Sequence, residues 1–235
     1  MPTKLLWRLL IGMIILIIAG GCSSLFEDKR SGDYAVASTN PPTFSLLIGG
    51  NELTESSDRQ LGDSYHKGIT IRELLKDSGI VQFAQDGNSI LSVSNVSLGP
   101  GLDWELQVDS KIINAADFNS SIDKDAHLVI TAKSETGEDS LQSVILIVNG
   151  GSEQAQLTHS YVMLFTEDVS VRSLLKGSGI VQLAENNRTV VSVKAYTPLT
   201  SEIWKLKVNG KQLLDSGMDM KLRPQDELEI ALTSR

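Results

Sequence analysis

The sequence has few of the residues that form disulfides or bind metal ions, cysteine and histidine. It has 235 residues with a single cysteine and three histidines. One cysteine excludes an internal disulfide framework and a cluster of thiolate metal ligands. Lysine and arginine number 21 against 29 aspartates and glutamates, with no basic cluster and a formal net charge of -8. Because binding to phosphates requires a basic stripe, this balance argues against a nucleic-acid partner.

Catalytic motifs are also missing. The sequence contains no Gly-x-Ser-x-Gly elbow, His-Glu-x-x-His helix, Walker loop, dinucleotide-binding glycine fingerprint or calcium loop. His66, His127 and His159 fall on different segments, so they do not suggest a triad or a metal site. The prediction is a protein that is not an enzyme and has no cofactor and no metal site. A surface hydrolase with an unrecognised set of residues is the less favoured alternative.

The N-terminus has the pattern of a targeting segment. Lys4 and Arg8 precede an apolar run over 9–19, which is followed by Gly20, Gly21 and the only cysteine, Cys22. A charged start, a short apolar stretch and small residues at the cut are typical of a signal peptide, whereas a membrane-spanning helix needs about twenty apolar residues. An uncleaved membrane anchor and a plainly secreted protein remain as alternatives.

The residues around Cys22 resemble the lipobox of bacterial lipoproteins, although that family usually has leucine where this chain has Ala19. The resemblance implies a signal peptide over 1–21 and a diacylglycerol on the Cys22 thiol, with palmitate as a typical acyl group. It implies attachment to the extracytoplasmic face of the cell membrane, or to an outer membrane if the cell has one. The polar stretch from 22 to 43 ends in Asn-Pro-Pro and is predicted to be a flexible tether.

The most informative feature is an internal repeat with a constant offset of 100 residues. Ile71-Arg72-Glu73-Leu74-Leu75-Lys76 aligns with Val171-Arg172-Ser173-Leu174-Leu175-Lys176, and Trp104 aligns with Trp204 without a gap. Such self-similarity indicates duplication of one structural unit. The sequence therefore predicts two domains, over 44–133 and 142–235, joined by a polar linker over 134–141.

Each copy predicts the same series of elements. An apolar strand at Phe44 to Ile48, or Val144 to Val148, precedes a short helix that begins after Thr70 or Ser170 and ends near Gly79 or Gly179. Strands follow, and the alternation of apolar and polar residues along them predicts a sheet with one buried face. The expected fold class is α+β, with one short helix on a mixed sheet in each copy. The expected later strands are Ile80 to Ala84, Ile90 to Val96, Trp104 to Val108 and, in the second copy, Leu228 to Leu232.

A family resemblance follows from these residues. A hydroxyl residue opening a helix with Leu-Leu-Lys, then Trp-x-x-x-Val-Asn-Gly-Lys and a last acidic turn, resembles the transcobalamin C-terminal-like domain. The second copy carries the pattern, and the first departs from it with Asp109-Ser110 in place of Asn-Gly. The resemblance implies two tandem β-grasp domains of the kind found in bacterial surface lipoproteins, where their function is unknown. The matching residues are Ser170, Leu174, Trp204, Val208, Asn209, Gly210, Lys211, Asp226 and Leu228.

Four side chains are candidates for ligand binding. Arg72 and Arg172 occupy the first turn of the expected helices, where a guanidinium could bind an anion, lie along the sheet or pair with a local acid. Trp104 and Trp204 could stack on a sugar or a corrinoid, but their alternation with apolar neighbours favours anchoring of the core.

The expected function combines these elements. It is that of a membrane-anchored extracytoplasmic lipoprotein acting as a non-enzymatic binding or adaptor module, with an unidentified protein or small molecule as partner. The alternative is a lipoprotein that binds a small ligand, either a corrinoid or a glycan.

Overall fold

The computed structural model describes residues 40–53, 57–136 and 141–235. The predicted signal peptide, Cys22 and nearly all of the predicted tether lie outside these residues. The cleavage, the lipid on Cys22 and the tether therefore stay predictions. None of the helices in the described part of the chain is long and apolar enough to cross a membrane.

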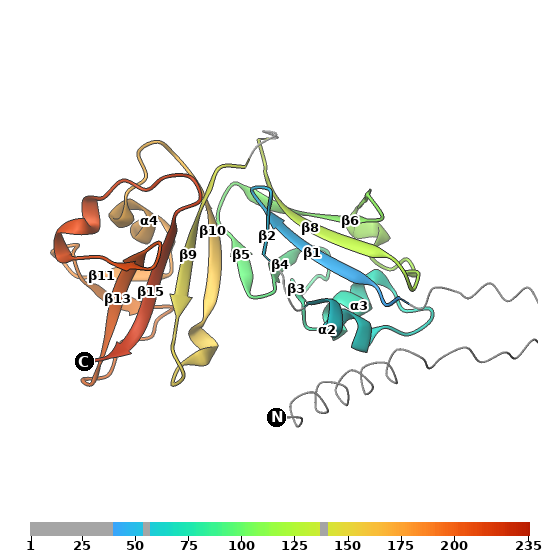
Figure 1. Ribbon diagram of the computed structural model, residues 1–235, viewed down its shortest axis with the longest axis horizontal. Coiled ribbons are helices and arrows are strands. Elements are labelled where there is room, and N and C mark those ends of the chain that lie inside the picture. The colour runs from blue at the N-terminus through green and yellow to red at the C-terminus, as the bar shows by residue number, and fades with distance from the viewer. Residues whose placement is uncertain (1–39, 54–56, 137–140) are drawn as a thin grey trace, which may run out of the picture. The chain divides into compact units, whose positions relative to one another are not determined.

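The described chain is α+β and consists mostly of strands with three short α-helices, which confirms the expected class (Figure 1). The expectation of one helix in each copy is wrong for the first copy, which has two. The helices are α2 (Ser57–Ser64), α3 (Ile71–Asp77) and α4 (Val171–Gly177).

The first repeat forms a five-stranded mixed sheet in the order β2-β1-β8-β6-β7. Its centre is a parallel pair, in which Phe44 faces Leu128 and Leu46 faces Ile130. The neighbouring pair is antiparallel and places Trp104 opposite Ala132. The strands are β1 (Thr43–Ile48), β2 (Asn51–Glu52), β6 (Leu102–Val108), β7 (Lys111–Ile113) and β8 (His127–Ser134).

The second repeat repeats this arrangement within a larger sheet. Its order is β14-β13-β15-β9-β10-β5-β4-β3, so the last three strands come from the first repeat. A separate pair, β11 (Val181–Leu183) and β12 (Val190–Val193), corresponds to β3 and β4. The remaining strands are β3 (Val81–Phe83), β4 (Ile90–Val93), β5 (Val96–Leu98), β9 (Ser143–Asn149), β10 (His159–Leu164), β13 (Glu202–Val208), β14 (Lys211–Gln212) and β15 (Glu227–Ser234).

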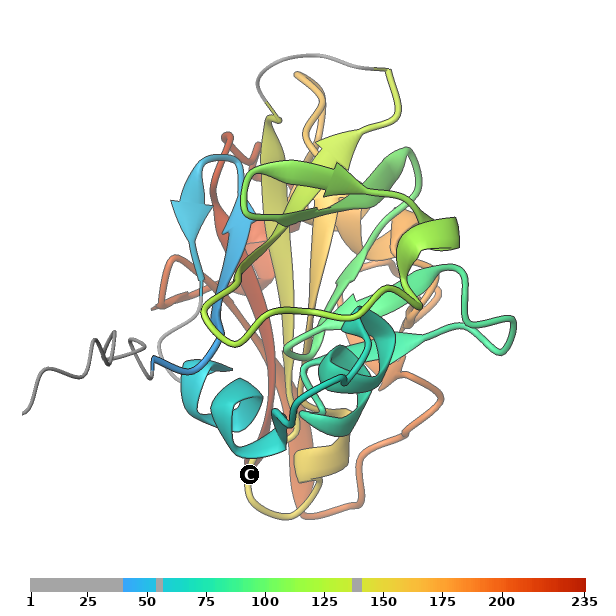
Figure 2. The same ribbon diagram turned by 90° about the vertical axis from the view of Figure 1, so that its right-hand side faces the viewer.

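The strand β10 joins the strands of the second repeat to β5, β4 and β3 of the first repeat. It pairs antiparallel with β9 and parallel with β5, where Ser160 faces Val96 and Val162 faces Leu98. The Gly99 N–H also donates to the Val162 carbonyl over 2.7 Å. At the offset of 100 residues, β10 lies over helix α2, so the repeats adopt different secondary structures here. The β-branched and aromatic residues of His159–Leu164 favour a strand, whereas the polar Ser57–Ser64 carries one buried leucine, Leu61, and packs beside β1 and α3 (Figure 2).

The helices α3 and α4 begin at the predicted residues. The Thr70 side chain accepts a hydrogen bond from the Glu73 N–H, and the Glu73 carboxylate accepts one from the Thr70 N–H. In the second repeat, Ser173 takes the place of the glutamate in the same reciprocal arrangement. After each helix, a glycine adopts a positive φ, 72° at Gly79 and 71° at Gly179, and these left-handed residues allow the chain to leave the helix.

One predicted strand is divided. The residues expected to form a single strand from Ile90 to Val96 form β4 and β5, with a turn at Ser94 and Asn95, both of positive φ. The polar pair Ser94-Asn95 interrupts the alternation of apolar residues and marks the turn. In the second repeat the corresponding turn lies at Lys194 and Ala195.

Two apolar cores lie against the sheets. The first is centred on Leu46, Leu74, Leu128 and Ile130 and includes Val162 from β10. The second is built from the equivalent residues of the second repeat: Leu146, Leu174, Leu228 and Ile230. Because successive residues of a strand point to opposite faces, β10 can place Val162 in the first core and Met163 in the second.

Candidate functional site

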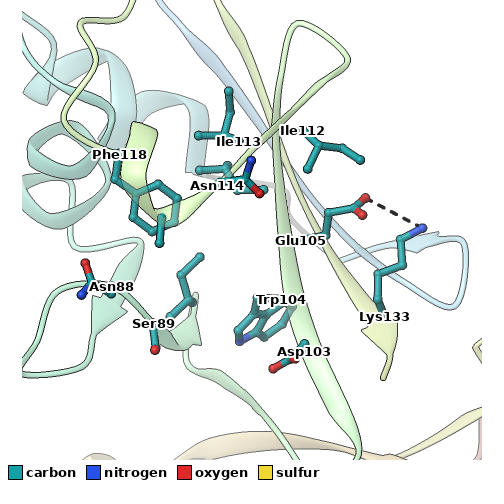
Figure 3. A pocket seen from close by; sticks show the side chains of 13 residues that line it. Asn88, Ser89, Asp103, Trp104, Glu105, Ile112, Ile113, Asn114, Phe118 and Lys133 are labelled. Carbon is teal, nitrogen blue, oxygen red and sulfur yellow. Dashed lines mark ion pairs between the residues drawn. The ribbon is translucent and has the colours of Figure 1, made fainter. Parts of the chain in front are cut away.

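The strand β6 places Trp104 at the wall of a surface hollow in the first repeat. This hollow, here called the Trp104 hollow, has a volume of about 440 Å³ and opens to solvent. Figure 3 shows Phe118, Ser89 and Trp104 around a shared space, with Glu105 and Lys133 at its far side. Its residues come from β4, β6, β7, β8 and the 3₁₀ helix Ala115–Asp117 with its flanking turns: Asn88, Ser89, Ile90, Asp103, Trp104, Glu105, Leu106, Ile112, Ile113, Asn114, Ala115, Phe118 and Lys133.

One part of the wall is apolar and accessible. Trp104 is partly buried, and its Nε1 atom is buried without a hydrogen-bond partner. Ile113 on β7 is partly buried and lies on the same face of the sheet as Trp104, whereas Ile112 pairs with Gln107 and lies on the opposite face. Phe118 is buried and packs edge-on against Phe83, with 5.7 Å between the ring centroids. The hollow therefore offers a fixed apolar surface formed by Trp104, Ile113 and Phe118.

The rest of the wall is polar. Among the side-chain hydrogen bonds and ion pairs formed within the described residues, none involves the side chains of Asn88, Ser89, Asp103 or Asn114. Glu105 is different, because it accepts a hydrogen bond from Gln107 over 2.8 Å and lies 3.9 Å from the Lys133 ammonium group. The hollow thus has four polar side chains available for a ligand and a neutralised carboxylate beside them.

The second repeat has a smaller hollow at the equivalent place. This Trp204 hollow has a volume of about 200 Å³, less than half that of its counterpart. At four equivalent positions, the polar Asn88, Asp103, Glu105 and Asn114 are replaced by basic or apolar side chains. The replacements are Arg188, Ile203, Lys205 and Leu214.

Packing around Trp204 explains the smaller volume. Trp204 is only 6% exposed, and the Tyr196 ring packs edge-on against it at a centroid distance of 6.3 Å. Met218, at the position of Phe118, is also buried. The Tyr196 hydroxyl donates to Glu202 over 2.8 Å, which holds the ring in place and raises the pKa of Tyr196. Of the two tryptophans, Trp204 is therefore a core residue, and Trp104 is partly available.

The two arginines also differ. Arg172 donates from Nε and Nη2 to the two carboxylate oxygens of Asp219, each over 2.9 Å, and from Nη1 to the Asn187 carbonyl over 2.8 Å. These hydrogen bonds lower the pKa of Asp219. In the first repeat Asn119 stands at the position of Asp219. Arg72 has no such carboxylate: its guanidinium lies 5.9 Å from the centroid of the Phe118 ring, and its Nε is buried without a partner.

A second hollow in the first repeat is larger but chemically less specific. It has a volume of about 490 Å³ and includes Asp109, Asp117 and Asp123. Within the described residues, no three acidic, histidine or cysteine side chains are arranged to hold a metal ion. No tryptophan, tyrosine or phenylalanine lines this hollow. The Trp104 hollow is therefore the better candidate site.

The structure brings only part of the predicted residue set together. Trp104 lines the hollow and Arg72 lies behind Phe118, while Trp204 and Arg172 belong to the second repeat and Cys22 lies outside the described residues. Asp103, Ile112, Asn114 and Phe118 were not among the residues predicted from the sequence. A signal for some of them was present, because the aligned repeats differ at 88/188, 103/203 and 114/214 around an identical tryptophan.

Comparison with known proteins adds little. No protein-family model matches the sequence, and no curated protein matches it. The solved structures that match include the crystal structure of a proposed metal-binding protein from Ruminococcus gnavus. It is 17% identical, covers 40% of this chain and 98% of its own, and has a TM-score of 0.32. At this level of similarity it carries no argument about the fold or the ligand of the present chain.

Proposed function

We propose that the protein is a non-enzymatic binding module, held at the extracytoplasmic face of a membrane by a lipid on Cys22, and that its ligand site is the Trp104 hollow. The observation that carries the proposal is the difference between two equivalent places: the hollow is only about 200 Å³ beside the buried Trp204, and it is about 440 Å³ beside the partly exposed Trp104. Since an open apolar wall is not needed for stability, its retention in one repeat supports a binding role.

In this proposal, each repeat is a β-grasp-like domain. A central parallel pair, β1 with β8 and β9 with β15, supports this assignment, as does one capped helix at equivalent positions in each repeat. The proposed domains are 44–133 and 142–235, although β10 and β5 hydrogen-bond across their boundary.

The absence of enzymatic activity is also part of the proposal. Ser89 is the hydroxyl side chain in the hollow, and within the described residues it makes no hydrogen bond to a histidine or a carboxylate that could activate it. Lys133 is neutralised by Glu105. These features support binding rather than covalent catalysis.

The test of binding is a thermal-shift screen of the purified full chain in detergent against corrinoids, cell-wall glycans, muropeptides and divalent metals. A ligand present at 100 times its Kd stabilises the folded state by about 2.7 kcal/mol. We expect a shift that is reduced by Asn114→Leu and kept by Leu214→Asn, which exchange the residues of the two hollows. A shift equal in both variants would contradict a site at Trp104.

The anchor is tested separately with Cys22→Ala. The expected result is loss of lipid labelling and of membrane fractionation. Retention in the membrane fraction without labelling would instead favour an uncleaved membrane anchor, and release of the natural chain would favour secretion.

A further inference from the structure

We propose that the ligand of the Trp104 hollow is a neutral glycan, bound through one or two sugar rings. This inference rests on the proposed binding function and names its ligand class. Three properties of the hollow carry it: the kind of surface that lines it, the polar groups left free around that surface, and the lack of charged side chains beside Trp104.

The apolar wall suits the face of a sugar ring. Trp104 and the partly buried Ile113 lie on the same face of the neighbouring strands β6 and β7, so their side chains are held in place by the sheet. The C–H groups on one face of a pyranose are weakly positive, and they pack against the negative face of an aromatic ring. A flat, rigid wall of this kind holds a ring without the entropy loss that a flexible surface would suffer.

The polar side chains match hydroxyl groups. A sugar hydroxyl both donates and accepts, and the amides of Asn88 and Asn114 do the same. Ser89 adds a hydroxyl, and its side chain has no partner among the described residues. Several convergent donors and acceptors beside one apolar wall are what a polyhydroxylated ligand requires.

The charge of the hollow selects against anions. The charged residues of the hollow, Asp103, Glu105 and Lys133, lie on the opposite face of the sheet from Trp104. The polar side chains around Trp104 are uncharged: Asn88, Ser89 and Asn114. A phosphate or carboxylate brought to this face would meet no basic side chain lining the hollow, which disfavours nucleotides and acidic sugars.

The volume limits the size of the bound part. At about 440 Å³, the hollow lies in the lower part of the range of roughly 300–1,000 Å³ that is usual for small-ligand sites. It has room for one or two sugar rings, with the remainder of a longer glycan in solvent. A corrinoid macrocycle with its side chains would not be enclosed.

The test begins with the full chain, purified in detergent, on an array of neutral and acidic glycans. We expect capture by a group of neutral glycans that share a terminal mono- or disaccharide. That sugar is then used as the free probe in calorimetric titration. Capture by acidic glycans alone, or by no glycan on the array, would overturn the proposal.

Variants locate the binding. Asn114→Leu introduces the residue of the second repeat, and it is expected to weaken the Kd about three- to tenfold through loss of one hydrogen bond. Asp103→Ile, on the opposite face of β6, and Leu214→Asn, in the second repeat, are matched controls that should leave the Kd unchanged. Trp104→Phe keeps a smaller apolar ring and should also weaken binding. Equal affinity in Asn114→Leu and the natural chain would overturn the assignment of the glycan to this hollow.

The same series separates this inference from the function on which it rests. If cyanocobalamin or another non-glycan binds and Asn114→Leu reduces its affinity, the glycan class is wrong and the binding module stands. If neither glycans nor the other small molecules bind, both proposals are wrong.

Discussion

Trp104 and Trp204 occupy the same register position of equivalent strands, but their surroundings differ. Trp204 lies opposite Leu232 and is enclosed by Tyr196 and Met218, whereas Trp104 lies opposite Ala132 and faces the hollow. Removal of a fully packed side chain costs both its transfer free energy and that of the cavity left behind. A partly exposed side chain has less of both to lose.

The first prediction follows from this difference. Trp204→Ala should lower the free energy of unfolding by about 3 to 5 kcal/mol, and Trp104→Ala by clearly less. Denaturant unfolding followed by far-ultraviolet circular dichroism measures both variants without using tryptophan as the probe. Equal losses would mean that Trp104 is packed as tightly as Trp204 and that the open hollow does not exist in solution.

At the scale of single elements, the turns between β6 and β7 and between β13 and β14 adopt the same left-handed conformation with different residues. Asn209 and Gly210 have φ values of 50° and 74°, and Asp109 and Ser110 have 49° and 66°. The side chain of the first turn residue accepts a hydrogen bond from the next strand in both repeats. Asp109 accepts from the His127 N–H, and Asn209 accepts from the Glu227 N–H, each over 2.9 Å.

The second prediction concerns the other turn residue. A left-handed conformation is unfavourable for Ser110 and free for glycine, so Ser110→Gly should stabilise the chain by about 1 kcal/mol. Gly210→Ser is the mirror experiment and should destabilise it by a similar amount. Urea unfolding at constant pH measures both. A destabilised Ser110→Gly chain would contradict the conformation described for this turn.

Local signals of this kind were readable in the sequence. The N-caps Thr70 and Ser170, the glycines that end the helices and the Asn209-Gly210 turn each depend on residues only a few positions apart. The helix α2 and the strand β10 were not predicted, because they lie at equivalent positions where the two repeats carry different residues and share no common pattern. The Trp104 hollow was not predicted, because its volume depends on how side chains from strands far apart in the sequence pack around Trp104.

At the scale of the whole described chain, a single histidine lies at the junction of the two repeats. His159 Nε2 is 2.8 Å from the Ser97 Oγ, and its ring packs at 4.8 Å from that of Tyr161. Burial lowers the pKa of His159, and the nearby positive charge of Lys194 lowers it further. The folded chain therefore favours the neutral imidazole at a place where β10 and β5 pair.

The third prediction gives the sign of the pH dependence. The unfolded chain binds a proton at His159 near the ordinary pKa of 6.5, whereas the folded chain binds it only at lower pH. The resulting stability is complete above 6.5 and is lost as the pH falls through the folded pKa. His159→Gln should remove this part of the pH dependence in thermal unfolding, and Ser97→Ala, which keeps the histidine, should retain it. A natural chain and His159→Gln chain with the same pH profile would show that the junction does not disfavour protonation.

The pairing of β5 with β10 also has a consequence for solubility. Unpaired N–H and C=O groups along an exposed strand are a template for association with other chains. In the intact chain, each of these two strands covers the open side of the other. A fragment that ended at residue 136 would leave β5 uncovered, and such a half-molecule should form dimers or precipitates that the undivided protein avoids. Duplication in this protein would then act as protection against self-association.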